Sequence, residues 1–157
     1  MRQPTILVLW SYRSDEVTTV LLVSRLRDAG LRVKLIGLDG RSCAGRVGLV
    51  LKADRTLAEW LASAGVDQCK QNQQLSGVIL PFDHAALQRF AHDERFLQLL
   101  HLAQQEDALI VLHEDQQPLF AELFMGDAAH LSLGNVRMLP APDEWHDFLY
   151  TFTQAFS

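Results

Sequence analysis

The chain has 157 residues, of which 48% are hydrophobic and 21% charged, and its formal net charge is −5. This length suits one domain with its own core, and the composition is typical of a folded globular protein. The acidic balance argues against a partner that is a nucleic acid or an anionic membrane, because both require clustered basic residues.

Cys43 and Cys69 are the two cysteines, too few for a disulfide framework and without the paired spacing of a zinc site. The first apolar segment is shorter than a signal-peptide core and far shorter than the roughly 20 residues of a membrane span. We therefore expect reduced thiols, a cytoplasmic location and no metal or other cofactor.

The first half of the sequence predicts a strand, a helix and a second strand. The apolar run 6–10 is typical of a parallel strand buried on both faces, and 33–37 is a similar run. Between them, Ser14 or Asp15 can cap a helix that stops at Ala29-Gly30. We expect the side chains on the core-facing side of this helix to be those of Val17, Val20, Leu21, Val23 and Leu26. A third apolar run covers 46–51, and a short helix is expected from Asp54 or Thr56 to about Gly65.

The second half continues the alternation. Apolar runs at 77–81 and 108–112 predict buried strands, and 136–139 a late strand. Helices are expected over 93–105 and 118–125, followed by a terminal helix with an apolar face of Trp145, Phe148, Leu149, Phe152 and Phe156. The fold class is therefore α/β: a flavodoxin-like, doubly wound, mainly parallel sheet flanked by helices in a three-layer sandwich, with residues 1–157 as a single domain.

In such sheets, ligands bind beyond the carboxyl ends of the strands, where the strand order reverses. This rule selects four loops, 10–16, 82–84, 113–117 and 140–143. The candidate ligand cleft consists of Trp10, Tyr12, Glu16, Phe82, Asp83, His84, His113 and Glu114.

Three stretches resemble one protein family. They are 6–9 with the acidic turn 15–17 and 25–38, then 49–57 with 77–81, and finally 90–97 with 108–112. Together they are similar to the ThiJ/PfpI superfamily of class I glutamine-amidotransferase-like proteins. Its members include cysteine-dependent hydrolases, glyoxalase or deglycase-type enzymes, chaperones and sensory domains. The resemblance implies a flavodoxin-like fold and a homodimer, since relatives commonly pair through surface helices near the first strand.

The chain departs from the family at the positions that carry its chemistry. The strained strand-to-helix turn that holds the family's cysteine reads here as residues 112–118, without cysteine, and the family's Pro-Gly-Gly is Pro81-Phe82-Asp83. Thr18 stands where many members carry a glutamate, with Glu16 two residues away, and His130 is the nearest candidate for a histidine after the turn. These departures predict a non-catalytic domain that acts in small-ligand binding, regulation or protein interaction. The aromatic residues Trp10, Tyr12 and Phe82 could hold a planar ligand in the cleft or plug it, and Phe82 in place of a glycine favours plugging.

An enzymatic alternative stays open. A cysteine-independent hydrolase or lyase, with or without a divalent metal, would use the acidic and histidine side chains at the strand ends. Its catalytic candidates are Glu16, Asp83, His113, Glu114 and Asp115. The plainer interpretation is that these are solvated residues of turns and helix starts, where acidic side chains are favoured.

Overall fold

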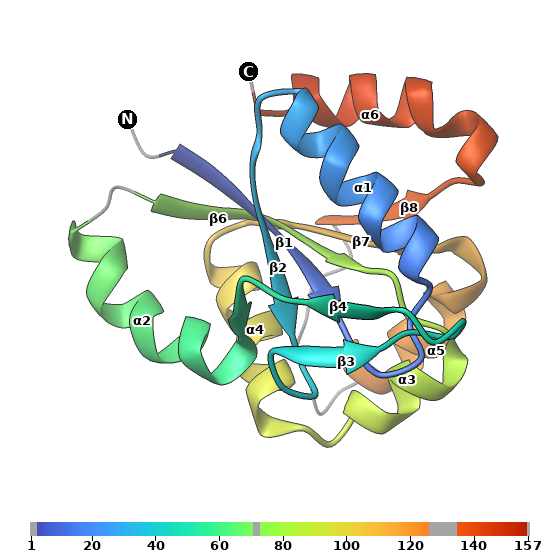
Figure 1. The fold of residues 1–157 in the computed structure, drawn as a ribbon. Coiled ribbons are helices and arrows are strands. Elements are labelled where there is room, and N and C mark those ends of the chain that lie inside the picture. The colour runs from blue at the N-terminus through green and yellow to red at the C-terminus, as the bar shows by residue number, and fades with distance from the viewer. Residues whose placement is uncertain (1–2, 71–72, 126–134, 157) are drawn as a thin grey trace.

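A parallel sheet forms the middle of three layers (Figure 1). The computed structural model describes residues 3–70, 73–125 and 135–156. Helices α1 (Glu16–Asp28) and α6 (Trp145–Gln154) cover one face of the sheet. The other face packs against α2 (Leu57–Lys70), α3 (His84–Phe90), α4 (Glu94–Gln105) and α5 (Gln117–Phe124).

The six strands of the main sheet lie in the order β5-β2-β1-β6-β7-β8, and each neighbouring pair is parallel. Their bounds are Gln3–Trp10 (β1), Arg32–Gly37 (β2), Arg55–Thr56 (β5), Gln73–Leu80 (β6), Leu109–His113 (β7) and Val136–Leu139 (β8). The chain winds outward in one direction through β2 and in the other through β6, so the order reverses between β1 and β6. This is the doubly wound topology predicted from the alternation of strands and helices.

The apolar runs are unbroken because each central strand is buried on both faces. In β1, Leu7 and Leu9 belong to the core under α2–α5, whereas Ile6 and Val8 belong to the core under α1 and α6. Strand β7 divides in the same way, with Val111 facing α6 and its neighbours facing the opposite layer. Successive side chains of a strand point to opposite faces, so a strand between two helical layers needs apolar residues at every position.

The predicted inward face of α1 is wrong in three positions. Its buried residues are Glu16, Thr18, Thr19, Leu22 and Leu26, whereas Val17, Val20 and Leu21 are 60%, 48% and 40% exposed. The cap at Asp15 and the hydrogen bonds of Glu16 to a neighbouring loop fix how the helix is rotated about its axis. That rotation buries two threonines and leaves three large apolar side chains at the surface.

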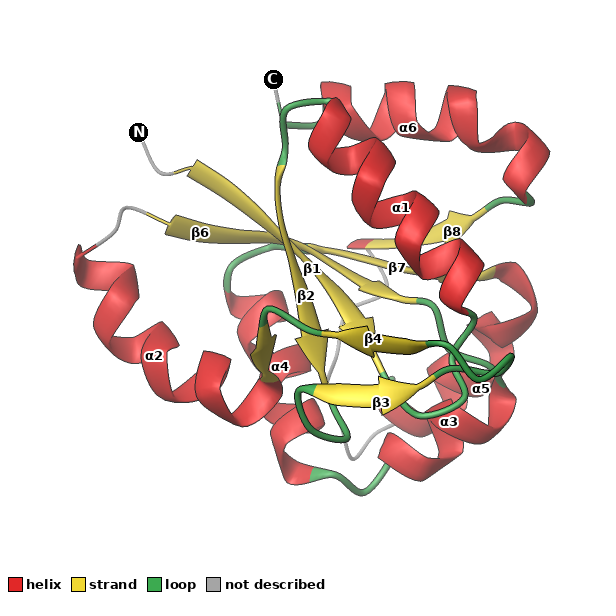
Figure 2. Ribbon diagram, in the orientation of Figure 1, coloured by secondary structure: helices red, strands yellow, loops and turns green. Residues whose placement is uncertain are grey.

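The run 46–51 is not a strand of the main sheet. Residues Ser42–Ala44 (β3) and Val50–Lys52 (β4) form a separate antiparallel hairpin, which Figure 2 shows in front of the sheet. The chain reverses at 45–49, where Gly48 has a φ of 88° that favours glycine. As a result Val47, Leu49 and Val50 are exposed instead of buried.

Of the remaining elements, α4, β7 and β8 agree closely with the sequence pattern. Helix α4 begins after Asp93, whose carboxylate accepts hydrogen bonds from the N–H groups of Arg95 and Phe96. Helix α2 continues to Lys70, past its predicted end near Gly65, and α3 was not predicted. Among the described residues, none of the helices combines the length and apolar character that a bilayer crossing requires.

Candidate functional site

A groove of about 950 Å³ lies beyond the carboxyl ends of β1, β7 and β8, and we call it the strand-end groove. Three of the four predicted loops contribute to it, and the loop 82–84 does not. Its lining residues are Asp15, Thr18, His113, Glu114, Asp115, Met138, Leu139, Pro140, Ala141, Glu144 and Trp145. Sequence reasoning missed Thr18, Glu144 and Trp145 as groove residues, although the strand-end rule had selected the loop beside the last two.

His113, Glu114 and Asp115 come together in this groove. His113 is the last residue of β7 and is half-buried, while Glu114 and Asp115 are exposed in the short 3-10 turn η1 (Glu114–Gln116) that leads into α5. The backbone here is ordinary: φ is −63° at His113, −92° at Gln116 and −58° at Gln117. Among the described non-glycine residues, positive φ occurs at Arg13 and Asp107, outside this turn. The strand-to-helix turn is therefore relaxed and lacks a cysteine.

Asp15 and Thr18 form the wall contributed by the start of α1. One Asp15 carboxylate oxygen accepts the backbone N–H of Thr18 at 3.1 Å, and the other lies 3.3 Å from a guanidinium nitrogen of Arg46. Asp15 thus acts as a helix cap and ion-pair partner. Thr18 lines the groove with a hydroxyl and not with a carboxylate.

Glu16 does not line the strand-end groove. Its side chain is buried, and the carboxylate accepts hydrogen bonds from the backbone N–H of Val47 at 3.0 Å and of Leu49 at 3.1 Å. Burial by itself raises the pKa of this carboxyl, but backbone N–H groups of Glu16, Val47, Leu49 and Arg46 outweigh that effect and hold the pKa below its ordinary value. The residue joins α1 to the loop 45–49 as a buried anion.

Two of the predicted cleft aromatics are part of the interior. Trp10 is fully buried, and its indole N–H donates to the carbonyl of Cys43 at 3.3 Å. Phe82 is 1% exposed, with ring centroids 5.4 Å from Phe90 and 6.1 Å from Phe96. Phe82 thus fills the space beside the end of β6 and, like Trp10, is buried instead of lining an open ligand cleft.

The other predicted cleft residues lie outside the strand-end groove. Asp83 caps α3, where its carboxylate accepts the N–H of Ala86 at 2.8 Å. Tyr12 is 54% exposed and His84 is exposed at the start of α3. His84 lies outside the groove because the 82–84 loop turns directly into α3, which packs under the sheet.

The chemistry of the strand-end groove is acidic. Four carboxylates, those of Asp15, Glu114, Asp115 and Glu144, line it together with one imidazole. Within residues 3–70, 73–125 and 135–156, no group of three or more His, Cys, Asp or Glu side chains is arranged to hold a metal ion.

Half-buried Cys43 lies outside the groove, and burial raises the pKa of its thiol. His130 and the side chain of Cys69 lie outside the described part.

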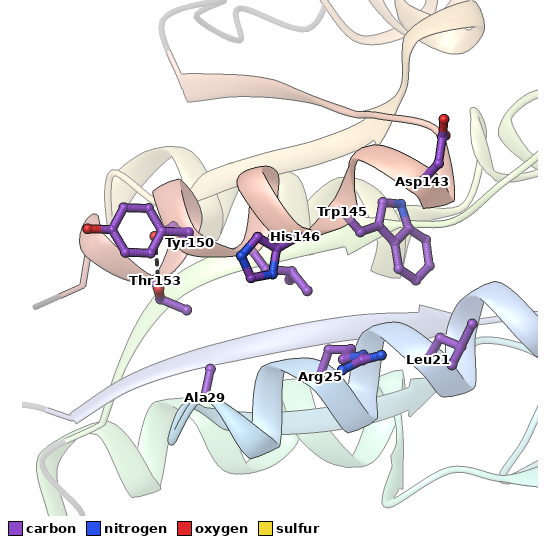
Figure 3. A pocket seen from close by; sticks show the side chains of 9 residues that line it. Leu21, Arg25, Ala29, Asp143, Trp145, His146, Tyr150 and Thr153 are labelled. Atoms are coloured by element: carbon purple, nitrogen blue, oxygen red, sulfur yellow. Dashed lines mark hydrogen bonds between the residues drawn. The ribbon is translucent and has the colours of Figure 1, made fainter.

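A second groove of about 440 Å³ runs between α1 and α6, and we call it the helix groove (Figure 3). Trp145 separates the two grooves: it lines both, and its indole N–H donates to the carbonyl of Pro140 at 3.0 Å. The helix groove is lined by Leu21, Arg25, Ala29, Asp143, Trp145, His146, Leu149, Tyr150 and Thr153. This groove was not predicted from the sequence. One feature that could have indicated it is Tyr150, a large aromatic residue that lies off the apolar face of the terminal helix.

The strand order and the ligand-accessible strand ends define the chain as a flavodoxin-like α/β domain. No protein-family model and no curated protein matches its sequence. Solved structures of DJ-1 proteins, of a DJ-1 superfamily protein and of a DJ-1/ThiJ/PfpI-like domain share its fold.

Three solved structures show how far the likeness extends. The VC2308 protein is 21% identical, with a TM-score of 0.72 over 100% of this chain and 87% of that chain. DJ-1beta of Drosophila melanogaster is 15% identical, with a TM-score of 0.73 over 99% and 91%. A two-domain protein of Anabaena variabilis, with DJ-1/ThiJ/PfpI-like and ferritin-like domains, is 15% identical, with a TM-score of 0.68 over 98% and 48%. This likeness is one of fold, and it agrees with the family suggested by the sequence.

Proposed function

We propose that the chain is a non-catalytic domain of the DJ-1/ThiJ/PfpI type that acts by binding, either a small ligand or a protein partner. The observation that carries this proposal is the relaxed turn at His113–Gln117. A nucleophile on a strained turn is held where backbone N–H groups can stabilise an oxyanion. Here no residue of the turn has a positive φ, its acidic side chains are exposed, and it contains no cysteine.

The end of β6 supports the same proposal. Glycines at this place would let backbone N–H groups approach a substrate closely. Phe82 is instead packed against Phe90 and Phe96, and the carboxylate of Asp83 is occupied as the cap of α3. Neither residue leaves room or charge suited to a developing oxyanion.

Turnover assays test the proposal. We expect the purified chain to show no deglycase, glyoxalase or amidase activity above that of the variants His113→Ala and Glu114→Ala. Glu122→Ala is the matched control, because Glu122 is another exposed carboxylate on the neighbouring helix α5. Turnover that is lost in Glu114→Ala and kept in Glu122→Ala would overturn the proposal.

The second candidate is a cysteine-independent hydrolase or lyase. It is favoured by one observation, the shared position of His113, Glu114 and Asp115 in the strand-end groove. Asp83 and Glu16 contribute nothing to that groove, so three of the five candidate side chains would carry the reaction. A bell-shaped pH profile of turnover that disappears in His113→Ala would support this alternative.

A homodimer belongs to the proposed function. The apolar patch formed by Val17, Val20, Val47, Leu49 and Val50 is exposed on α1 and the β3–β4 hairpin, which Glu16 holds together. Exposed apolar residues on two elements joined in this way indicate an interaction surface, and a second copy fits because the same patch can face itself across a two-fold axis. The cytoplasmic location predicted from the sequence is part of the same proposal, and imaging of a tagged chain tests it.

A further inference from the structure

The helix groove brings one cation together with an apolar and aromatic wall. Arg25 comes from the last turn of α1, and Figure 3 shows it between the two helices, with His146 of α6 opposite. Leu21 and Trp145 lie at one end of the groove, and Ala29 and Tyr150 at the other. The groove therefore has a cation near its centre, with large apolar or aromatic side chains toward both ends.

Arg25 is unpaired, which distinguishes it from its neighbour on the same helix. Arg27 donates to the carboxylate of Asp54 at 3.0 Å and to the carbonyl of Val33 at 3.1 Å. Among the residues that the structure describes, the guanidinium group of Arg25 has no hydrogen-bond or ion-pair partner. A guanidinium group can donate two parallel N–H hydrogen bonds to one carboxylate. The guanidinium N–H groups of Arg25 are available for such a bidentate contact.

The other polar groups leave the site available to an anion. Asp143 is the one acidic residue in the lining, and Figure 3 shows its carboxylate pointing away from Arg25 at the far end. His146 adds an exposed imidazole on the opposite wall. Apolar surface from Leu21, Leu149 and Tyr150 can cover the body of a ligand, and the volume of about 440 Å³ is in the range of small-molecule sites.

The geometry points to the helix groove as a binding site for a carboxylate with an aromatic or aliphatic body, with Arg25 holding the carboxylate and Leu21, Leu149 and Tyr150 covering the body. This inference rests on the proposed binding role and names its ligand class. The strand-end groove is the contrasting site, because four carboxylates there oppose an anionic ligand.

The experiment compares naphthalene-2-carboxylate with the neutral naphthalene-2-methanol, using backbone amide shifts in two-dimensional NMR and a titration for Kd. We expect the acid to shift the amides of α1 and α6 around Arg25 and Tyr150 and to bind at least about tenfold more tightly than the alcohol. Arg25→Gln should weaken the acid about tenfold and leave the alcohol unchanged. Arg95→Gln is the matched control, since it removes an exposed positive charge on α4, and it should leave both unchanged.

Tyr150→Ala separates the two parts of the site. Because Tyr150 contributes to the apolar wall, its removal should weaken the acid and the alcohol by the same factor. Equal binding of the acid to wild type and Arg25→Gln, shifts confined to the strand-end groove, or no binding at millimolar probe would overturn the inference. Enzymatic turnover would contradict the non-catalytic role but would not change carboxylate binding in the helix groove. The proposed function and this inference can therefore be refuted independently.

Discussion

The carboxylate of Glu16 accepts a hydrogen bond from the backbone N–H of Val47 at 3.0 Å, which ties the first turn of α1 to the loop between β3 and β4. A second N–H, that of Leu49, points to the same oxygen at 3.1 Å. An anion buried at the start of a helix is further stabilised by the helix dipole. A residue that the sequence offered as a catalytic candidate thus has a structural role in positioning the hairpin.

Glu16→Gln should destabilise the protein in a pH-dependent way. The folded-state pKa of Glu16 is below its ordinary value of 4.5, so its contribution to stability is present above that value and is lost as the pH falls through the folded pKa. The difference in unfolding free energy between wild type and Glu16→Gln should therefore be largest near neutral pH and shrink in acid. Chemical denaturation at several pH values measures it.

Glu114→Gln is the control for this experiment, because Glu114 is exposed in the turn after β7. We expect a small change in stability from this variant. A stability gap for Glu16→Gln that stays constant with pH, or that Glu114→Gln reproduces, would contradict the role assigned to Glu16.

Gly45→Ala should be destabilising because of Glu16. A Cβ atom at position 45 would lie 2.1 Å from the carboxyl carbon of Glu16, so the alanine must displace a hydrogen-bonded buried side chain. We expect a loss of about 1–3 kcal/mol, typical of overpacking. In a Glu16→Ala background the same change should cost less, and a double-mutant cycle by urea denaturation measures the coupling. Additive effects would show that the two residues act independently.

Phe82→Ala should lower the unfolding free energy by about 3–5 kcal/mol, because it removes a buried ring from contact with Phe90 and Phe96. Tyr12→Ala is the control, as Tyr12 is an exposed aromatic residue on a neighbouring strand end, and it should change stability by about 0.5 kcal/mol or less. Equal effects of the two variants would indicate that Phe82 does not fill a structural pocket.

Sedimentation equilibrium tests the proposed homodimer. Val20→Asp on α1 and Leu49→Asp on the hairpin should each raise the dimer Kd by about tenfold or more, since they place a charge in the apolar patch. Ala62→Asp, an exposed site on α2 under the other face of the sheet, should leave the Kd unchanged. A wild-type chain that is monomeric at every concentration would rule out this interface.

The predictions succeeded where one local pattern has one structural solution. The run 6–10 had to be a buried strand, and the spacing of Phe96, Leu99, Leu100 and Ala103 had to be one face of a helix. They failed where an apolar residue could be placed in two ways. Val20 and Leu21 suit a core as well as an interface, and nothing in the sequence indicates that Thr18 and Thr19 are buried in their place.

The sequence by itself determined the α/β class, the order of the main strands and helices, and the lack of a cysteine at the strand-to-helix turn. Those features depend on local periodicity and residue identity. Only the tertiary structure decided that Glu16 faces the hairpin, that Phe82 is interior, and that Arg25 stands unpaired opposite α6. Each of these depends on the rotation of a helix or the direction of a loop, which is set by contacts between residues far apart in the chain.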